Sequence, residues 1–496
     1  MSQNSKAHYA VVIALACLFP NPVFGAGVSF SQFKSVGRAS SQHADLNNDG
    51  REDFISVNPN GAGFTVQLST GDGTYAVPAS YKLPNQNTVS LVGIGDFNSD
   101  GKADLVVVGL DSTGMNETLF LYLNNGGGIF TERTSFPLSY AQTYDIVIAD
   151  FNHDGRMDIA FEEDGHIDVW VGNGKGGFTV GPTSPSNAIG NMMLGDFDGD
   201  GYADLAISDR ITSKFVQVLF GDGTGSFPVP TYFGIPTNSI VGATDVNGDG
   251  RMDIVASSNS PNAPNHIEVY YGDPNRNWNE NTVIPIAHCA SGQGAAVAAD
   301  MNGDGIKDLI VPETDCGKNG NGYNYIGVLT RNSNATYNPD QIVYKSSSPA
   351  LSVQGPYTIR GNRDTKPDIA LTQCTKSPCL TASEHDLRVL LNTTSGAFHS
   401  CEAPAAFEGI NVCSPTPGGT ATSPISFRVG AAGQVEMRKV EVWVDGKKAV
   451  EQLNGFSKYS FLDDSLVLMS GTHRIAIYAA GWDNSLQEKS FNLNVK

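Results

Sequence analysis

Basic residues and long apolar runs are both scarce in this chain of 496 residues. Lysine and arginine together number 31 against 51 aspartates and glutamates, so the formal net charge is −20. This acidic excess repels phosphate backbones and excludes nucleic acid as a partner. After the N-terminal segment no apolar run approaches the ~18 residues of a membrane-spanning helix, so we expect no transmembrane span. No helical period of useful length occurs either, which argues against a helical fold.

The common catalytic motifs are also absent. The sequence contains no GxSxG nucleophile elbow, no HExxH zinc motif and no phosphate-binding loop. No CxxC pair occurs and histidines number only 9, which excludes a zinc site built from cysteine and histidine. Paired carboxylates are frequent, but the metal loops described below account for most of them. We therefore expect a protein that is not an enzyme.

The first 26 residues are typical of a signal peptide (1–26). Lys6 precedes an apolar run from Tyr9 to Phe19, and small residues at 25 and 26 offer a cleavage site. Lipidation at Cys17 stays open, although the apolar run continues beyond this residue. We predict export, with a secreted, periplasmic or cell-surface location.

Cleavage of this segment leaves six cysteines, an even count that fits an oxidising compartment. Proximity in the sequence favours the pairs 289–316, 374–379 and 401–413. A pairing of Cys401 or Cys413 with Cys374 or Cys379 is the alternative.

Glycine is abundant, at 55 residues, which is typical of a turn-rich β protein. Much of it belongs to a nine-residue pattern, DxNxDGxxD or DxDxDGxxD, that occurs six times. We name these copies loops 1 to 6: they are residues 45–53, 96–104, 150–158, 196–204, 245–253 and 300–308. A repeat period near 50 residues indicates a solenoid or a propeller. A worn seventh copy, loop 7 (360–368), keeps Asn362, Asp364 and Asp368 but has Arg360 at position 1 and Thr365 in place of the glycine.

The residues around each loop predict four short strands per repeat. A run rich in β-branched and apolar residues follows each loop, as in 105–108, 159–161 and 254–256. A further strand then ends in a glycine-rich corner with an aromatic residue, as in 172–178. Four strands per repeat match a propeller blade. The predicted fold is therefore all-β, a seven-bladed β-propeller over 27–400, whose last blade is completed by an N-terminal strand within 27–33.

The repeated loops predict calcium sites. Calcium takes six to eight oxygen ligands, and oxygens at positions 1, 3, 5 and 9 with the carbonyl of position 7 supply most of them. Glycine at position 6 permits the sharp turn. The candidate ligands are Asp45, Asn47, Asp49, Arg51 and Asp53; Asp96, Asn98, Asp100, Lys102 and Asp104; Asp150, Asn152, Asp154, Arg156 and Asp158; Asp196, Asp198, Asp200, Tyr202 and Asp204; Asp245, Asn247, Asp249, Arg251 and Asp253; and Asp300, Asn302, Asp304, Ile306 and Asp308. We expect about six Ca²⁺ ions, and none in loop 7.

This pattern resembles the FG-GAP/VCBS repeat family, whose blades also build the head of integrin α-subunits and certain calcium-bound lectins. The resemblance covers about residues 27–400. It implies that each loop joins two adjacent strands of a blade and binds calcium. It implies function only loosely, because such propellers serve adhesion, glycan binding and, in some cases, lyase sites.

The C-terminal part of the chain has a different pattern. We expect a disulfide-bearing linker over 401–423, rich in proline and glycine, and then a small β-sandwich over 424–496. Apolar residues alternate at 440, 442 and 444 and again at 475, 477 and 479. The segment 471–483 resembles bacterial Ig-like domains of secreted proteins.

Three functions fit these observations. The first is an exported calcium-binding module for adhesion to a glycan or a surface protein, bound through the variable segments 111–117, 259–265 and 315–324. The second is a polysaccharide lyase or hydrolase built on the same calcium-stabilised propeller. The third is a structural protein of the cell envelope.

Overall fold

The computed structural model describes residues 28, 34–37, 42–49, 51–57, 61, 63–71, 73–84, 88–138, 143–163, 165–186, 188–190, 192–208, 216–228, 230–233, 240–258, 265–278, 281–291, 295–304, 306–316, 322–332, 334–346, 353–359, 366–374, 385–394, 409–423, 425–481 and 485–496. These residues form strands, turns and short connections, without any α-helix. None of the described segments is a helix that could span a membrane.

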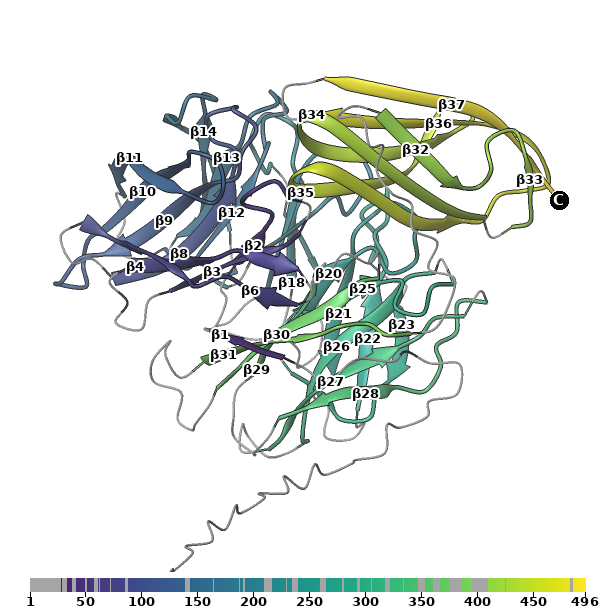
Figure 1. Cartoon of the computed structure of the whole chain (residues 1–496), viewed down its shortest axis with the longest axis horizontal. Coiled ribbons are helices and arrows are strands. Elements are labelled where there is room, and N and C mark those ends of the chain that lie inside the picture. Colours follow the sequence, from purple (N-terminus) through teal and green to yellow (C-terminus); the bar gives the residue numbers. More distant parts are fainter. Residues whose placement is uncertain are drawn as a thin grey trace, which may run out of the picture.

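Seven antiparallel sheets of four or five strands follow one another along the chain (Figure 1). Sheet 1 contains β2 (Gln42–Ala44), β3 (Asp53–Val57), β4 (Gly63–Gln67) and β7 (Ala79–Lys82); sheet 2 contains β8 (Thr88–Gly95), β9 (Asp104–Leu110), β10 (Glu117–Asn124) and β11 (Phe130–Pro137); sheet 3 contains β12 (Asp145–Ala149), β13 (Asp158–Glu163), β14 (His166–Gly172) and β15 (Phe178–Pro185). Sheet 4 contains β16 (Met192–Gly195), β17 (Asp204–Ser208), β18 (Val216–Leu219) and β19 (Pro230–Phe233); sheet 5 contains β20 (Ile240–Thr244), β21 (Asp253–Ser258), β22 (His266–Tyr270) and β23 (Asn281–Pro285). Sheet 6 contains β24 (Cys289–Ala290), β25 (Val297–Ala299), β26 (Asp308–Thr314), β27 (Asn324–Leu329) and β28 (Gln341–Lys345). β5 (Ser69–Gly71) and β6 (Thr74–Tyr75) form a separate two-stranded sheet.

The seventh sheet joins the two ends of the repeat region. It contains β29 (Val353–Ile359), β30 (Asp368–Cys374) and β31 (His385–Leu390), and its fourth strand is β1 (Lys34–Gly37). β1 runs antiparallel to β31, with Lys34 opposite Val389. An N-terminal strand therefore completes the last sheet, a few residues after the predicted range 27–33.

Each sheet shares a hydrophobic core with its neighbour. Ile167 of sheet 3 packs in one cluster with Leu205 of sheet 4, and Val255 of sheet 5 packs with Leu309 of sheet 6. The first and last sheets meet in the same way, because Phe54 of sheet 1 belongs to a cluster with residues of β29, β30 and β31. The sheets thus form a closed ring, and the predicted all-β propeller fold is confirmed.

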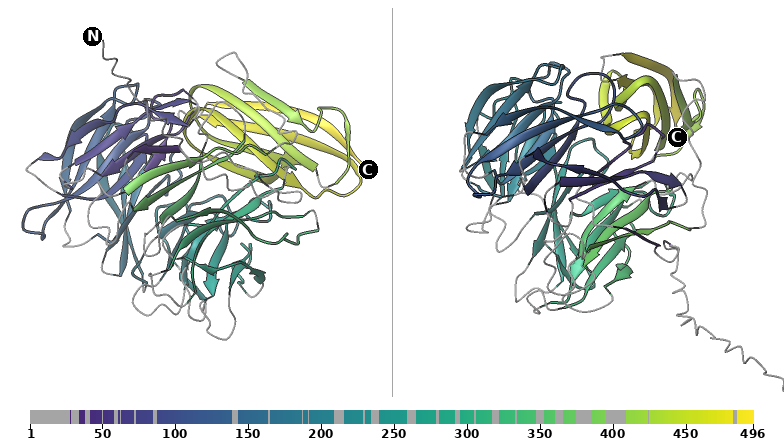
Figure 2. Two further views of the ribbon diagram at one scale, coloured as in Figure 1. Left: turned by 60° about the horizontal axis from the view of Figure 1, so that its bottom comes forward. Right: turned by 60° about the vertical axis from the view of Figure 1, so that its left-hand side comes forward.

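Six further strands form the C-terminal module, which we define as residues 409–496. They are β32 (Gly409–Ser414), β33 (Thr420–Ala421), β34 (Ile425–Val444), β35 (Lys447–Leu466), β36 (Gly471–Gly481) and β37 (Leu486–Val495). Their inward side chains, among them Phe427, Val442 and Ile477, form one buried core. Figure 2 shows these strands gathered beside the ring.

Two of these strands lie in the range 401–423 that we predicted to be a linker. β32 pairs with β34, and the short β33 pairs with β37 in parallel. The linker range is therefore part of the C-terminal sheet from Gly409 onward. The sequence did not predict β32 and β33, because the prolines and glycines at 415–419 interrupt the alternating pattern by which strands are recognised.

One disulfide, between Cys289 and Cys316, joins the start of sheet 6 to the segment after β26, as its proximity in the sequence predicted. Cys413 is also disulfide-bonded, to a partner outside the described side chains. The pairs 374–379 and 401–413 therefore stay predictions.

Candidate metal centres

The six loops occupy equivalent places in six sheets. In sheets 1 to 5 each loop joins the first strand to the second, as loop 2 joins β8 to β9 and loop 4 joins β16 to β17, and in sheet 6 loop 6 joins β25 to β26. Since these strand pairs are antiparallel and the sheets follow one ring, all six loops emerge at one face. We call this the metal-loop face.

Two positions of the loops take left-handed backbone angles, position 4 in all six loops and position 6 in the four loops where the structure describes it. Position 6 is glycine, and its φ lies between 78° and 90° at Gly101, Gly155, Gly201 and Gly250. Position 4 is also left-handed, with φ of 59° at Asn48, 56° at Ser99 and 59° at His153 and with glycine in loops 4 to 6. The left-handed backbone at position 4 was not among the sequence predictions. The residue types at position 4 could have predicted it, since asparagine and glycine are enriched in the left-handed region, where φ is positive.

The side-chain oxygens of positions 1, 3 and 5 hold the turn together. In every loop the N–H of position 5 donates to the side-chain oxygen of position 3, at 2.9–3.1 Å. The N–H of position 7 likewise donates to the carboxylate of position 5, at 2.8–3.1 Å. These bonds direct the oxygens toward the inside of the loop. A carboxylate offers about four lone-pair positions, so each still has capacity for a cation.

The aspartate at position 9 is a predicted calcium ligand, and it also accepts hydrogen bonds that anchor the loop. In loop 4 Asp204 accepts an N–H from Phe197 at 2.9 Å and another from Gly221 at 2.8 Å. The same two bonds recur in the other five loops, and all six position-9 carboxyl groups are fully buried. Position 9 thus ties each loop to the end of the third strand. Worn loop 7 keeps this bond, since Asp368 accepts the N–H of Asn392 at 2.7 Å.

Burial raises the pKa of the position-9 carboxyl groups. Removal from water raises the pKa of Asp53, Asp104, Asp204 and Asp308 to about 8, although the backbone N–H donors oppose the rise. Neighbouring carboxylates of the same loop raise it further. A divalent cation beside them favours the charged form and reverses this shift.

Position 7 carries a basic side chain in four loops. Arg51 and Arg251 pair with the position-5 carboxylates Asp49 and Asp249. Lys102 pairs in the same way with Asp100 at 2.7 Å, and Arg156 with Asp154 at 3.0 Å. Loops 4 and 6 have Tyr202 and Ile306 there instead.

The donor set fits calcium. Side-chain oxygens and a backbone carbonyl, without nitrogen or sulfur, select hard cations. Within the described residues one group of three carboxylates brings its oxygens within 4.8 Å of one another, namely Asp196, Asp198 and Asp204 of loop 4. The other five loops have asparagine at position 3, so the matching oxygen there belongs to an amide. Positions 360–365 of loop 7 lie outside the described residues.

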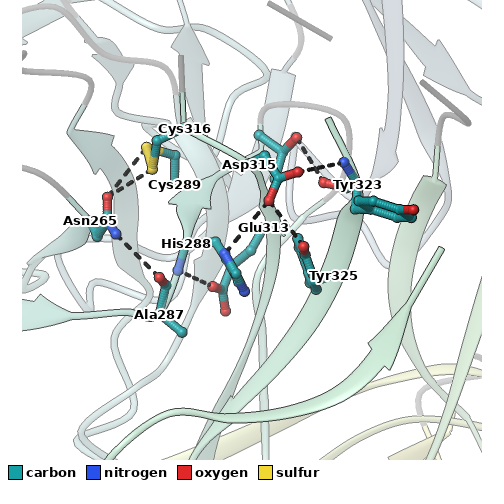
Figure 3. Close-up of a disulfide and its surroundings, with 10 residues drawn as sticks. Asn265, Ala287, His288, Cys289, Glu313, Asp315, Cys316, Tyr323 and Tyr325 are labelled. Carbon is teal, nitrogen blue, oxygen red and sulfur yellow. Dashed lines mark hydrogen bonds and ion pairs between the residues drawn. A yellow bond between two sulfur atoms is a disulfide. The ribbon is translucent and has the colours of Figure 1, made fainter. Parts of the chain in front are cut away.

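A second cluster lies at the opposite end of sheets 5 and 6, around the disulfide (Figure 3). Asn265 contacts both sulfurs and donates to the carbonyl of Ala287 at 3.1 Å. The His288 ring stacks on Tyr325 with centroids 3.8 Å apart. Asp315 accepts the Tyr325 hydroxyl at 3.0 Å. The structure therefore brings together the described ends of two variable segments, 259–265 and 315–324.

Two carboxyl groups that were not among the sequence predictions support this cluster, the buried Glu313 and the half-buried Asp340. Glu313 accepts the N–H of His288 at 2.8 Å, and Asp340 accepts that of Ala287 at 2.9 Å. Burial, followed by the charge of Asp340, raises the pKa of Glu313 to about 9. Burial and the neighbouring carboxylate thus favour the protonated form of Glu313. No sequence motif marked these residues, which lie 27 positions apart, Glu313 on β26 and Asp340 directly before β28.

The third variable segment, 111–117, is a closed turn. Asp111 accepts the N–H of Thr113 at 3.0 Å and the side-chain amide of Asn116 at 2.6 Å. These bonds, led by that to Asn116, lower the pKa of Asp111. Its polar groups are engaged within the turn, while the Met115 side chain projects into solvent.

Five overlapping stretches of the chain match the family described as FG-GAP-like repeat, at residues 45–107, 96–161, 154–207, 196–256 and 245–311. Together they span 45–311, more than half of the chain. No curated protein sequence matches it.

Several solved structures are similar at low identity. An Agrocybe aegerita lectin, described as recognising non-reducing terminal N-acetylglucosamine, has 17% identity and a TM-score of 0.43, over 63% of this chain and 81% of the lectin. The S. cerevisiae core factor has 10% identity and a TM-score of 0.45, over 75% of this chain and 62% of that one. The Dos1 propeller has 12% identity and a TM-score of 0.36, over 54% of this chain and 63% of that one. These values assign no ligand or activity to the chain.

Proposed function

The chain belongs to the FG-GAP-like repeat family, and from this premise we propose that it is an exported, calcium-binding β-propeller that acts as a binding or adhesion module for a glycan or a surface protein. Calcium occupies loops 1 to 6 in this proposal, and the C-terminal module is an Ig-like sandwich. The Cys289–Cys316 disulfide supports export, because such bonds persist in oxidising compartments.

The ring offers a recognition face away from the metal loops. The connections between the second and third strands of sheets 1 to 5, and between β26 and β27 of sheet 6, lie at the ends opposite to the loops, because consecutive strands are antiparallel. The observation that carries the proposal is that two of these connections meet there around one disulfide. We call this group of Asn265, His288, Asp315, Tyr323 and Lys345 the disulfide cluster.

The chemistry of the disulfide cluster suits a polar ligand with apolar faces. The Lys345 ammonium lies 4.0 Å from the centre of the half-exposed Tyr323 ring. Tyrosine offers an apolar ring face together with a polar hydroxyl. His288 and Asp315 keep 29% and 28% of their side-chain surface exposed, so both can hydrogen-bond a ligand. Sugar rings, with apolar C–H faces and many hydroxyls, match this arrangement.

A glycan array probed with the calcium-loaded full-length chain tests the proposal. We expect binding to a limited set of glycans and a loss of at least tenfold in Tyr323→Ala, on the order of one ring contact at an interface. Val180→Ala is the matched control, because Val180 is 70% exposed on the outer strand of sheet 3. Equal loss in both variants, or unchanged binding in Tyr323→Ala, contradicts the assignment of this site.

A lyase or hydrolase on the same propeller is the second candidate. The observation in its favour is that Glu313 and Asp340 lie beneath His288 and Tyr325 and that burial raises the pKa of both carboxyl groups, since raised pKa values are typical of general acids. Turnover assays on uronic-acid polysaccharides with the wild type and Glu313→Gln test it. Absence of both turnover and glycan binding favours the structural envelope role.

A further inference from the structure

The C-terminal module covers part of the metal-loop face. The carbonyl of Ala449 and the backbone of Val450 lie against Gly250 of loop 5, where an added Cβ would meet them at 3.0 and 3.5 Å. Arg428 donates to the carbonyl of Gly303 in loop 6 at 3.1 Å. Lys448 lies near Gly201 of loop 4. Strands β34 and β35 thus contact three consecutive loops.

Two of these contacts bring positive charge to loop carboxylates. Arg428 lies 3.5 Å from the Asp300 carboxylate, and the two side chains are only 8% and 4% exposed. Coulombic attraction likewise links the Lys448 ammonium to Asp196 of loop 4. Both partners are position-1 residues, the first candidate ligand in each loop. A buried charge requires a compensating partner, so these pairs contribute to the docking of the module.

The two loops reached by these cations are those without a basic residue at position 7. Loops 1, 2, 3 and 5 pair their own arginine or lysine with position 5. Loop 4 has Tyr202 and loop 6 has Ile306. The module therefore brings charge to the two loops that lack a position-7 cation of their own, and in loop 4 Arg276 of the repeat region adds a second cation beside Asp198 and Asp200.

The charges of these two loops balance with one divalent ion. Loop 6 has three carboxylates, so a divalent cation leaves one negative charge, which Arg428 neutralises. Loop 4 has four carboxylates, and a divalent cation leaves two negative charges. Arg276, 2.8 Å from Asp198, and Lys448 provide the matching two positive charges. The docked module and a metal ion can therefore be present together, but they neutralise the same carboxylates.

We propose that the C-terminal module is a calcium-linked lid on loops 4 to 6, in which Arg428 and Lys448 bring positive charge to the position-1 carboxylates of the two loops that lack a position-7 cation. This inference rests on the proposed calcium sites. The lid cations Arg428 and Lys448 and the calcium ion are all positively charged and approach the same carboxylates. The docked lid therefore lowers the calcium affinity of loops 4 and 6. By linkage, calcium loosens the lid by the same factor.

Hydrogen exchange with mass spectrometry on the full chain tests this, because it reports each loop separately. Calcium is titrated while exchange is followed in peptides that cover loops 1 to 6 and the Arg428 region of β34. We compare the wild type with Arg428→Gln, Lys448→Gln and the matched control Lys447→Gln, which removes the same charge from an exposed neighbour on β35. Loops 1 to 3 are the internal reference.

We expect Arg428→Gln to lower the calcium midpoint of loop 6, and Lys448→Gln that of loop 4, each by about fivefold or more. The Arg428 region should exchange faster in the first variant, and Lys447→Gln should leave both midpoints unchanged. If loops 1 to 3 respond to calcium but the midpoints of loops 4 and 6 stay constant or rise in both variants, the lid is refuted and the calcium sites stand. If no loop responds to calcium, the proposed function itself fails.

Discussion

Removal of calcium should lower the melting temperature of the propeller by about 10 °C. The donor geometry recurs in six loops, and each loop depends on folded strands at both ends. The unfolded chain does not hold these oxygens together. On the proposed function, calcium therefore binds the native state alone and adds RT ln(1 + [Ca]/Kd) per site to the free energy of unfolding.

The magnitude follows from the number of sites. Extracellular calcium sites can be as weak as about 10⁻⁴–10⁻³ M. At tenfold excess each site contributes about 1.4 kcal/mol, and six independent sites contribute about 8 kcal/mol. An unfolding entropy of about 2.1 cal/mol/K per residue gives about 0.8 kcal/mol/K for the ~370 residues of the propeller. Dividing the stabilisation of about 8 kcal/mol by the unfolding entropy of about 0.8 kcal/mol/K gives the expected shift in melting temperature of about 10 °C.

Differential scanning calorimetry in 5 mM calcium and in excess EDTA measures this shift. Magnesium at equal concentration is the control, because it gives up its water reluctantly. Asp100→Asn should reduce the calcium-dependent gain by about one site, or 1.4 kcal/mol. Asp222→Asn, which changes an exposed acid outside the loops, should not. Equal melting temperatures in calcium and EDTA would refute the reasoning.

Three further results are expected. Asp204→Asn, measured in EDTA, should lower the free energy of unfolding by about 1–3 kcal/mol, because an amide has one oxygen for the two N–H donors of Phe197 and Gly221. A loss no larger than that of Asp222→Asn would contradict the role of Asp204 in anchoring its loop. Burial and Asp340 raise the pKa of Glu313 from its ordinary value of 4.5 to about 9, so its contribution to stability is complete below pH 4.5 and is lost as the pH rises toward 9. Glu313→Gln should therefore flatten the fall of the urea midpoint between pH 5 and 9, and an unchanged slope excludes Glu313 as its source. Joint replacement of Cys289 and Cys316 by serine should lower the free energy of unfolding by about 3–4 kcal/mol, because the disulfide closes a loop with a sequence separation of 27 residues. Urea unfolding measures this loss, and a value below about 1 kcal/mol would contradict the loop-closure argument.

Local patterns in the sequence determined the repeat and its chemistry. The spacing of aspartates, asparagines and glycine within nine residues predicts a turn, an oxygen donor set and the strand that follows, because all of these depend on neighbours along the chain. The period near 50 residues then predicts the propeller, whose sheets are each stabilised by the next. The 289–316 disulfide followed from short separation alone.

Contacts between distant parts were decided only by the tertiary structure. The second bond of Asp204, to Gly221, depends on how the third strand ends, and the proximity of Glu313 to Asp340 depends on how β26 lies relative to the start of β28. The strand β32 gains its partner from β34, although its proline-rich surroundings predicted a linker. Arg428 reaches Asp300 across 128 positions of sequence. Such side chains carry no local signal, because the free energy of each contact depends on a neighbour that only the folded ring and its C-terminal module bring close.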